Sequence, residues 1–449
     1  MKIGPRGTIS LRPADHPLRL RALVRTLIVL VSLSAVSGLP GAATEQSHVS
    51  SSPATDAGTT SSSPTLPRVD RGFRWGVASS AFQSEGGRLP SNWHKYAQSE
   101  EPYLNSVDFR HRYPADIRRA KELGVNTYRI GINWARVEPR PGVINKRGLR
   151  FYDDVVHTIR ANGMQPLITL DHFVYPQWVL DQGAWDNPKT VDDFVRFAKR
   201  IVRRYQDDVR WWIVFNEPFC YVAVETGRRR MTPVQVALMY DHLVAAHRRV
   251  YNVVHAANPR AMVSSNECTP SLAEPERWVA DALFLDRVED RIDYVGIDYY
   301  YRDIRADLIT LMSGDIWNIP LDPAGLYPVL TDYHERYPSL PIVVTENGMA
   351  TDNGKPRSDG WTRSGHLQDN IYWMQRAIED GVPVRGYFYW SLTDNYEWGS
   401  YRPRFGLYKV NVTTDKNLVR HPTAAVKKFK TIIRRGGMPS SYLPPGSPH

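Results

Sequence analysis

Short apolar runs alternate with longer amphipathic stretches along most of the chain. Eight runs of apolar and β-branched residues have the length of strands that are buried on both faces, and they lie at 73–78, 125–133, 165–172, 211–216, 261–266, 292–299, 341–346 and 384–392. The stretches between them repeat apolar residues at helical spacing, most clearly at 115–123, 149–161, 191–205, 233–257, 323–336 and 365–380. Glycine follows three of these helices, at Gly124, Gly163 and Gly381, where a left-handed helix cap is expected.

This order of elements predicts an α/β fold. Eight strands that each precede a helix are the number that a closed (β/α)8 TIM barrel requires, and we predict one such barrel over residues 71–436. An open, doubly wound sheet would place a glycine-rich phosphate loop after the first strand. Residues 79–87 lack that spacing, so the barrel is favoured, with a flexible C-terminal tail at 437–449.

The N-terminal part of the chain has a different composition. Residues 26–36 form an uncharged apolar run behind a basic N-terminus and ahead of small residues, which predicts a signal peptide over residues 1–43. An uncleaved membrane anchor is the alternative, but the run is short for a bilayer span and Pro40 follows it closely. Residues 44–70 are rich in Ser, Thr and Pro, which predicts a disordered, flexible linker. We therefore expect a protein that is secreted or associated with the cell envelope.

Charge and cysteine content narrow the function classes. The formal net charge is +10, but half of it belongs to the predicted signal peptide, which has six basic residues and one acidic residue. The remainder has no long basic run, so we predict no binding to nucleic acid. The two cysteines, Cys220 and Cys268, are too few for a disulfide framework and lack the spacing of metal ligands. We interpret both as small buried apolar residues, with Cys220 close enough to an Asn-Glu-Pro motif to lie near a site.

Two glutamates stand at the ends of predicted strands. The run 341–346 ends on Glu346, just before an Asn-Gly pair, and the run 211–216 is followed by Glu217. In a barrel of parallel strands the carboxyl ends of all strands meet at one mouth. The two carboxylates are therefore predicted to face each other, an arrangement typical of enzymes that cleave glycosidic bonds.

Other polar and aromatic residues are predicted to reach the same mouth. They also follow the carboxyl ends of strands, and they are Gln83, Arg129, Trp134, His172, Asn216, Tyr300, Trp390, Glu397 and Trp398. Amide, imidazole and carboxylate groups supply both hydrogen-bond donors and acceptors, and indole rings offer flat apolar faces. This combination suits a polyhydroxylated ligand.

Five motifs resemble those of glycoside hydrolase family 1, in unbroken order from about residue 72 to 429. They are Trp-Gly-Val-Ala-Ser-Ser-Ala-Phe-Gln-Ser-Glu-Gly at 75–86, Tyr-Arg-Ile-Gly-Ile-Asn-Trp at 128–134, Asn-Glu-Pro at 216–218, Thr-Glu-Asn-Gly at 345–348 and Trp-Ser-Leu-Thr-Asp-Asn-Tyr-Glu-Trp at 390–398. The resemblance implies a retaining β-glycosidase, with carboxyl groups about 5–5.5 Å apart. It implies that Glu217 is the general acid/base and that Glu346 is the nucleophile.

The resemblance also assigns supporting roles. Arg129 would keep the nucleophile charged, together with Tyr300, because a neighbouring cation or donor favours an ionised carboxylate. The sugar-binding positions of the family carry over to Gln83, His172, Asn216, Trp390, Glu397 and Trp398. The Glu-Trp pair at 397–398 implies an unphosphorylated sugar, and the presence of Glu217 argues against a thioglucosidase. The expected partner is thus a β-glycoside, in small-molecule or oligosaccharide form.

Three departures from the family pattern qualify this expectation. Asp298 stands where the family usually has Asn, and an added acid near Glu346 would raise the pKa of that carboxyl or need a partner of its own. Phe173 replaces a common Trp and so removes an indole donor. The chain between Glu217 and Glu346 is short for the family, mainly between residues 268 and 292, which predicts an open aglycone side.

Two other functions remain open on the same residues. A transglycosidase, which transfers the sugar to an alcohol instead of water, would have an identical residue set. A non-catalytic, secreted sugar-binding protein on this scaffold would typically lack one of the two glutamates, and this chain keeps both. We predict no metal and no organic cofactor, because the sequence shows neither a ligand cluster nor a nucleotide loop.

Overall fold

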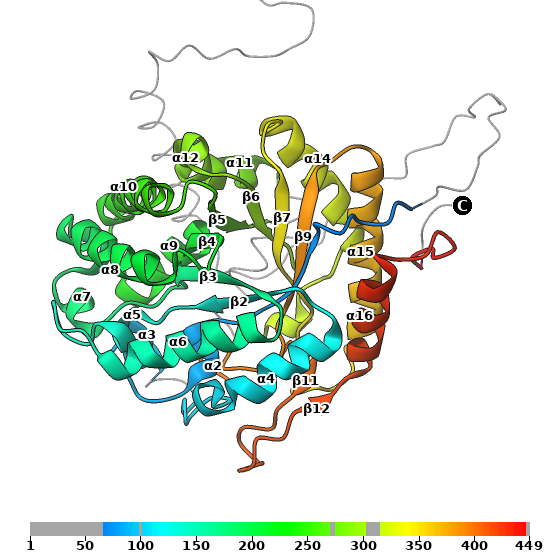
Figure 1. Cartoon of the computed structure of the whole chain (residues 1–449), viewed down its shortest axis with the longest axis horizontal. Coiled ribbons are helices and arrows are strands. Elements are labelled where there is room, and N and C mark those ends of the chain that lie inside the picture. The colour runs from blue at the N-terminus through cyan, green and yellow to red at the C-terminus, as the bar shows by residue number, and fades with distance from the viewer. Residues whose placement is uncertain (1–65, 98–100, 270–273, 302–314, 446–449) are drawn as a thin grey trace, which may run out of the picture.

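Eight parallel strands close into a barrel at the centre of the molecule (Figure 1). In order around the barrel they are β1 (Arg74–Ala78), β2 (Thr127–Gly131), β3 (Gln165–Asp171), β4 (Trp211–Asn216), β5 (Met262–Cys268), β6 (Val295–Asp298), β7 (Ile342–Asn347) and β9 (Val384–Trp390). The computed structural model describes residues 66–97, 101–269, 274–301 and 315–445. Each strand pairs with the next along the chain and β9 pairs with β1, so the predicted (β/α)8 fold is confirmed.

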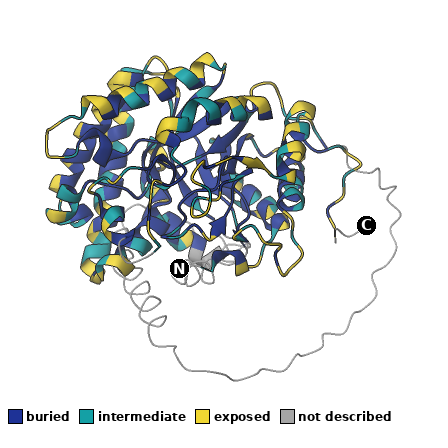
Figure 2. Cartoon of the chain, turned by 90° about the horizontal axis from the view of Figure 1, so that it is seen from below, coloured by how far each residue is buried: buried dark blue, intermediate teal, exposed yellow. Residues whose placement is uncertain are grey.

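Helices on the outside connect successive strands (Figure 1). They are α4 (Phe109–Leu123), α6 (Lys146–Ala161), α8 (Lys189–Tyr205), α10 (Pro233–Ala257), α11 (Glu274–Leu283) with α12 (Leu285–Val288), α14 (Leu326–Arg336), α15 (Arg363–Glu379) and, after the last strand, α16 (Ala424–Arg435). Figure 2 shows that the helices are exposed on their outer faces and that the strands are buried. The apolar stripe of each helix therefore faces the barrel, as expected from its periodicity.

Shorter elements lie in the loops between these units. The helical ones are α2 (Ala81–Glu85), α3 (Asn92–Ala97), α5 (Trp134–Val137), α7 (Gln177–Asp181) and α9 (Pro218–Arg229). Two small antiparallel pairs join β8 (Thr351–Asp352) to β10 (Pro403–Arg404) and β11 (Tyr408–Lys409) to β12 (His421–Pro422). Most of these elements follow the carboxyl end of a strand, where the loops of such barrels form the site.

The structure confirms the glycine caps predicted after three helices and corrects the predicted start of one helix. Gly124, Gly163 and Gly381 all have positive φ values, of 94°, 71° and 96°. The helix predicted to begin after Pro114 begins instead at Phe109 and continues through the proline. Pro114 removes only one backbone hydrogen bond, and the helix buries Phe109 on the near side of it and Ile117 on the far side. Packing of this apolar face extends the helix beyond the limit that local propensity sets.

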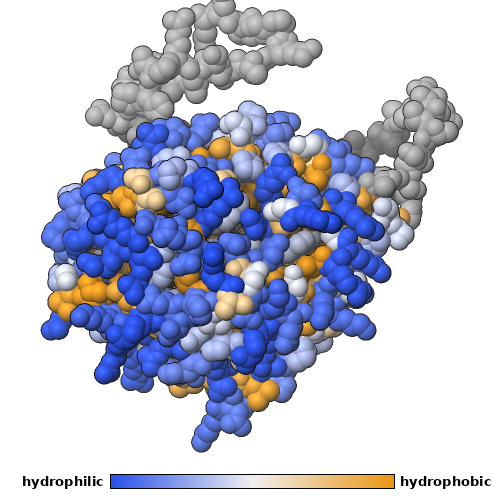
Figure 3. All heavy atoms as spheres, in the orientation of Figure 1, coloured by the Kyte–Doolittle hydropathy of each residue, from blue (hydrophilic) through white to orange (hydrophobic). Residues whose placement is uncertain are grey.

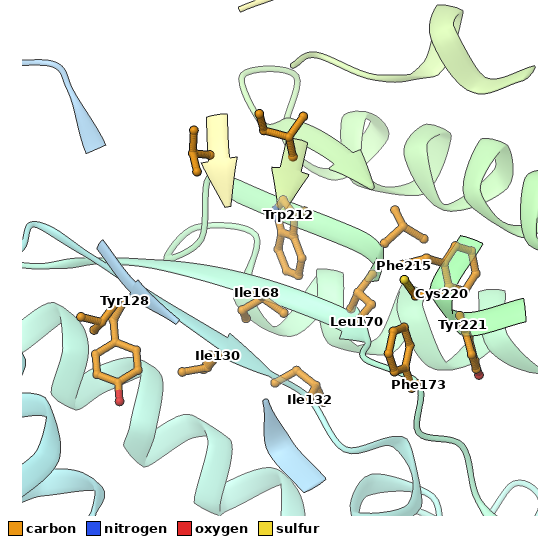
Figure 4. Packing of buried hydrophobic residues seen from close by; sticks show 14 of the residues in the cluster. Tyr128, Ile130, Ile132, Ile168, Leu170, Phe173, Trp212, Phe215, Cys220 and Tyr221 are labelled. Atoms are coloured by element: carbon orange, nitrogen blue, oxygen red, sulfur yellow. The ribbon is translucent and has the colours of Figure 1, made fainter. Parts of the chain in front are cut away.

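Two apolar layers lie on opposite faces of the strands. Trp211 and Ile213 belong to the cluster that includes Val343 and Phe388, inside the barrel. Their neighbours face outward, because successive strand residues point to opposite faces, and Trp212 packs between the strands and the helices (Figure 4). Both faces are buried, which explains why the strands are continuously apolar instead of alternating.

Chain segments on both sides of the barrel units contact the outer helices. The backbone N–H of Val69 donates to the carbonyl of Gly436 at 3.0 Å. Gln375 on α15 donates to the carbonyl of Pro67 at 2.7 Å and accepts from the N–H of Met438 at 2.6 Å. Contacts with the barrel thus extend past the predicted limits at 71 and 436. The predicted signal peptide and most of the predicted linker, residues 1–65, lie outside the described residues.

The surface in Figure 3 is mainly hydrophilic, with small apolar areas between charged ones. Among the described helices, none combines the length and the apolar character that a bilayer crossing requires.

Candidate active site

Glu346 lies near the end of β7 and is held by two donors. Its side chain accepts from Arg129 Nη1 at 2.7 Å through one oxygen and from the Tyr300 hydroxyl at 2.6 Å through the other. Arg129 comes from β2 and is 1% exposed, so its guanidinium is fixed inside the barrel. Both carboxylate oxygens of Glu346 are thus oriented, one by a residue within β2 and the other by a residue just after β6.

Glu217 follows β4 at the point where the chain turns into α9. Its backbone has φ 39° and ψ 66°, in the left-handed region that non-glycine residues seldom adopt. The N–H of Glu217 donates to the carbonyl of Asn266 on β5 at 2.8 Å, and Pro218 begins the helix. This strained turn at a candidate site places the side chain at the mouth of the barrel.

The two glutamates face each other across the mouth. One carboxylate oxygen each from Glu217, Asp298 and Glu346 lie within 4.8 Å of one another. The strand register explains this convergence, because Asp298 pairs with Glu346 across β6 and β7, and Asn216, one residue before Glu217, pairs with Asn266 on β5. The separation is close to that of retaining glycosidases and shorter than the 6.5–9.5 Å of inverting ones.

The surroundings of Glu217 and Glu346 give the two carboxyls different pKa values. Burial raises the pKa of Glu217 well above its usual range, and the nearby Cys220, Asp298 and Glu346 raise it further. Burial also raises the pKa of Glu346, but Arg129 and the hydrogen bond from Tyr300 lower it. Among the described residues, no arginine or lysine forms an ion pair with Glu217. Glu217 is therefore the carboxyl that keeps its proton to higher pH.

Asp298, the unusual acid, has partners of its own. Its oxygens accept from the Thr345 hydroxyl at 2.6 Å and from the side-chain amide of Asn266. Its nearest contact with Arg129 is 4.0 Å, longer than the 2.7 Å contact that Arg129 makes with Glu346. Burial and the charge of Glu346 raise the pKa of Asp298 well above its usual range, against the effect of Arg129.

Replacing Asp298 by Asn is expected to stabilise the protein increasingly as the pH rises. Because its folded pKa is raised, Asp298 contributes stability that is present below its unfolded pKa of about 3.9 and is lost as the pH rises through the folded pKa. An asparagine fits the site, since its oxygen can accept from Asn266 while Thr345 donates to the Ile297 carbonyl, 3.1 Å away. The gain is about 1.4 kcal/mol for each pKa unit removed. Urea unfolding between pH 4 and pH 8 measures it.

Asp415 supplies a control of opposite sign for that experiment. It is half-buried, and the backbone N–H groups of Val419 and Asn417 lower its pKa. Replacing Asp415 by Asn therefore removes stability that is present above the unfolded pKa and is lost as the pH falls. If the Asp298 variant instead loses stability relative to the wild type as the pH rises, the folded protein does not raise the pKa of Asp298.

A hydrogen-bonded wall lies beside the carboxylates. Gln83 donates from Nε2 to Glu397 at 2.7 Å, and the indole N–H of Trp390 donates to the other oxygen of Glu397 at 2.8 Å. Burial raises the pKa of Glu397 to about 8, against the effect of the Trp390 bond. The wall joins α2, the end of β9 and the loop after it, so its polar groups are oriented before a ligand arrives.

Two aromatic groups complete the wall. The ring of His172 stacks on Trp390 with centroids 5.6 Å apart and planes 15° apart. Burial lowers the pKa of His172 well below its usual range, with a further contribution from Arg129, so the ring is neutral. Its Nδ1 is buried and has no hydrogen-bond partner among the described residues. Trp398 packs against Phe173 at 5.8 Å and faces the same pocket.

One pocket collects nearly all of the predicted site residues. Nine of the ten line it, namely Gln83, His172, Asn216, Glu217, Tyr300, Glu346, Trp390, Glu397 and Trp398. The tenth, Arg129, is buried and does not line the pocket, but it donates to Glu346 and Asn216, which do. Trp134, also expected at the mouth, instead packs in the core, stacked on Phe197 at 5.3 Å.

Asn266 is the connecting residue that sequence reasoning missed. Its amide Nδ2 donates to Asn216 at 3.0 Å and also to Asp298. Arg129 donates to the same oxygen of Asn216, so the amide nitrogen of Asn216 is left for a ligand. Asn266 is the last residue of the strand predicted at 261–266, and this position at a strand end was the one signal that could have identified it.

Apolar and thiol groups make up most of the remaining lining of the pocket. They are Phe82, Trp93, Phe173, Val174, Cys220, Cys268, Tyr301, Ile316 and Phe405. Part of the shortened segment, residues 270–273, lies outside the described residues. The open aglycone side therefore stays a prediction.

Gly348 is fixed by close packing behind Glu346. A Cβ atom at this position would lie 2.1 Å from the carbonyl oxygen of Trp390, which is backbone and cannot rotate away. Replacing Gly348 by Ala is therefore expected to lower the free energy of unfolding by about 1–3 kcal/mol and to slow catalysis by moving Trp390 or Glu346. Thermal unfolding and kcat/KM measure the two effects.

Gly72 provides the matched control. A Cβ atom there would meet mainly the Asp70 carboxylate, 3.1 Å away, at the end of a side chain that can move. Equal unfolding free energies for the two alanine variants would contradict the close-packing argument for Gly348.

Two groups of side chains in the pocket could hold a metal ion. One consists of the carboxylates Glu217, Asp298 and Glu346, and the other of Glu217 with Cys220 and Cys268. Arg129 already pairs with Glu346 in the first group, so its positive charge opposes a cation there. In the second group, none of the three side chains forms an ion pair with an arginine or lysine among the described residues.

Comparisons with known proteins agree with this geometry. The sequence profile of glycosyl hydrolase family 1 matches residues 66–277 and 304–438. The chain is 27% identical to β-glucosidase A of Thermotoga maritima, over 79% of this chain and 96% of that protein. It is 26% identical to a β-galactosidase of Pyrococcus woesei, over 82% of this chain and 97% of the relative.

A solved structure gives the same result. The β-glucosidase of Thermotoga maritima in complex with a methoxycarbonyl-substituted glucoimidazole has a TM-score of 0.71 at 25% identity. The match covers 83% of this chain and 99% of the other. The profile match, the barrel and the converging glutamates together show that the chain belongs to glycosyl hydrolase family 1 and is a glycoside hydrolase.

Proposed function

We propose that this hydrolase is a retaining β-glycosidase that acts on β-D-glucosides or related unphosphorylated β-glycosides by double displacement. The observation that carries the proposal is the approach of Glu217 and Glu346 to within 4.8 Å, with Arg129 and Tyr300 donating to Glu346 and not to Glu217. That asymmetry gives the two carboxyls different tasks, because one must be ionised while the other is protonated.

In the first step Glu346 attacks the anomeric carbon of the bound sugar. The bond from that carbon to the aglycone oxygen breaks, and Glu217 donates its proton to the departing oxygen. Arg129 and Tyr300 hold the Glu346 oxygens in place, which leaves the carboxylate oriented for attack. The product is a glycosyl ester of Glu346 and a free alcohol.

In the second step water attacks the anomeric carbon of the ester. Esterification has removed the negative charge of Glu346, which is one of the groups that raise the pKa of Glu217. The pKa of Glu217 therefore falls, and its carboxylate takes a proton from the water. The ester bond breaks, Glu346 recovers its charge, and the sugar leaves with its original anomeric configuration.

The polar wall supports the choice of substrate class. Gln83, Glu397 and the neutral His172 offer donors and acceptors to hydroxyl groups, and Asn216 donates from its free amide nitrogen to the 2-hydroxyl. The Glu397 carboxyl carries no positive charge in either protonation state, so it offers a phosphate on the sugar no favourable partner. The named relatives include a β-glucosidase and a β-galactosidase, so the panel of substrates includes both sugars.

A set of nitrophenyl β-glycosides tests this function directly. We expect hydrolysis of at least one of the glucoside, galactoside and fucoside, and proton NMR is expected to detect the β-anomer of the free sugar first. Early appearance of the α-anomer would show an inverting enzyme and reject the mechanism. Added alcohol distinguishes hydrolysis from transfer, because a transglycosidase would form mainly the alkyl β-glycoside.

We also propose that the chain is exported through its N-terminal 43 residues. The proposal rests on the basic N-terminus, the apolar run and the small residues after it. Expression of the full-length chain in its native host, with N-terminal sequencing of the protein from the medium and the cell envelope, tests it. A mature protein that begins at Met1 and stays with the cytoplasmic fraction would contradict the proposal.

A further inference from the structure

Two thiols and the Glu217 carboxylate meet on one side of the pocket. Cys220 lies in the first turn of α9, three residues after Glu217, and Cys268 is the last residue of β5. Their sulfur atoms and one Glu217 oxygen lie within 4.8 Å of one another, and all three residues line the pocket.

We propose that Cys220, Cys268 and Glu217 form a binding site for a thiophilic divalent cation such as Zn²⁺ or Cd²⁺, and that its occupation blocks glycoside hydrolysis. Two thiolates and one carboxylate are three ligands of the kinds that tetrahedral zinc sites use. All three residues line the pocket, so a water molecule in the pocket can complete the coordination. Binding displaces the two thiol protons and the Glu217 proton to solvent.

The composition of this group selects the kind of cation. Sulfur ligands favour soft and borderline metals over Mg²⁺ and Ca²⁺, which prefer oxygen. The alternative group in the pocket, Glu217 with Asp298 and Glu346, consists of oxygen ligands and would suit a hard cation. There, however, Arg129 lies 2.7 Å from Glu346 and 4.0 Å from Asp298, so an added cation would be repelled.

Occupation of the site removes the acid/base from the reaction. A carboxylate that is bound to a metal ion cannot carry the proton that the leaving oxygen needs, so glycoside cleavage stops until the ion leaves. This inhibitory effect rests on the proposed role of Glu217. The binding itself does not, because it can be measured by absorption without any substrate.

The binding experiment uses the full chain, thiol-reduced and freed of metal by a chelator, and titrates it with Cd²⁺. The chain has two cysteines, so any thiolate-to-cadmium charge-transfer absorption must come from Cys220 and Cys268. We expect this absorption to saturate at one ion per chain in the wild type and to be absent from the Cys220→Ser/Cys268→Ser variant. Wild-type protein without this absorption at saturating Cd²⁺ would overturn the proposal.

The inhibition experiment compares each protein with its own rate in the absence of metal. We expect Zn²⁺ to inhibit the wild type reversibly, a chelator to restore the rate, and Mg²⁺ to have no effect. Cys268→Ser alone should raise the Zn²⁺ concentration for half inhibition by at least about tenfold, because one ligand is lost. Equal inhibition of wild type and this variant would overturn the inhibitory role.

These outcomes separate the metal site from the proposed function. Cadmium absorption without any glycosidase activity would reject the proposed function and support the metal site. Glycosidase activity without the absorption would support the proposed function and reject the metal site. Should the double variant fail to fold, wild-type protein alkylated at both thiols serves as the reference, and persistence of the absorption after alkylation would equally overturn the proposal.

Discussion

Replacing Glu346 by alanine is expected to lower kcat on a nitrophenyl β-glycoside by at least about 10⁴-fold. The substitution removes the atom that attacks the anomeric carbon, and none of the described neighbours can replace it. Asp298 is the nearest other carboxylate, but its oxygens accept from Thr345 and Asn266 and its protonated form is favoured by burial. Steady-state kinetics measures the loss, and unchanged activity would end the assignment of Glu346 as the nucleophile.

Azide gives this prediction a stereochemical readout. A small anion can enter the space that the Glu346 side chain vacates and attack the anomeric carbon once, which inverts the configuration. We therefore expect azide to restore activity to the Glu346→Ala variant and to yield the α-glycosyl azide. A β-glycosyl azide from this variant would contradict the proposed role, because it requires an intact enzyme nucleophile.

The barrel and its mouth could be predicted because they depend on local patterns. Each strand is a short apolar run, and each site residue follows a strand end, so the position of Glu346 after 341–345 already places it at the mouth. The parallel arrangement then brings distant strand ends together without further information. The same reasoning placed Gln83, His172 and Glu397, which all line the pocket.

Contacts that depend on register and side-chain packing could not be predicted in this way. Asn266 bridges Asn216 and Asp298 only because β4, β5 and β6 align at that level. The proximity of Cys220 and Cys268 also depends on how the strands align. The two cysteines are far apart in the sequence, so their spacing gives no sign of a metal site. Trp134 follows a strand end like the residues that line the pocket, but it turns outward to Phe197 in the core.

Replacing Glu217 by alanine is expected to lower kcat/KM on a 4-nitrophenyl β-glycoside by about 10²–10⁴-fold, the usual contribution of a general acid/base. The loss should be smaller for a 2,4-dinitrophenyl glycoside, whose leaving group needs no proton. The fall in rate at high pH should also disappear, because in the proposed mechanism that fall reflects the loss of the Glu217 proton at a raised pKa. Rates on both substrates across the pH range measure these effects.

The product formed with azide distinguishes this variant from the Glu346 variant. With Glu346 intact, the glycosyl ester still forms, and azide attacks it without needing a base, so two inversions yield the β-glycosyl azide. A Glu267→Gln variant is the matched control, because Glu267 is also buried beside β4 and accepts from the N–H of Phe219 at 3.3 Å, but it does not line the pocket. Equal losses in the Glu217 and Glu267 variants would show that a buried carboxyl, and not an acid/base, had been removed.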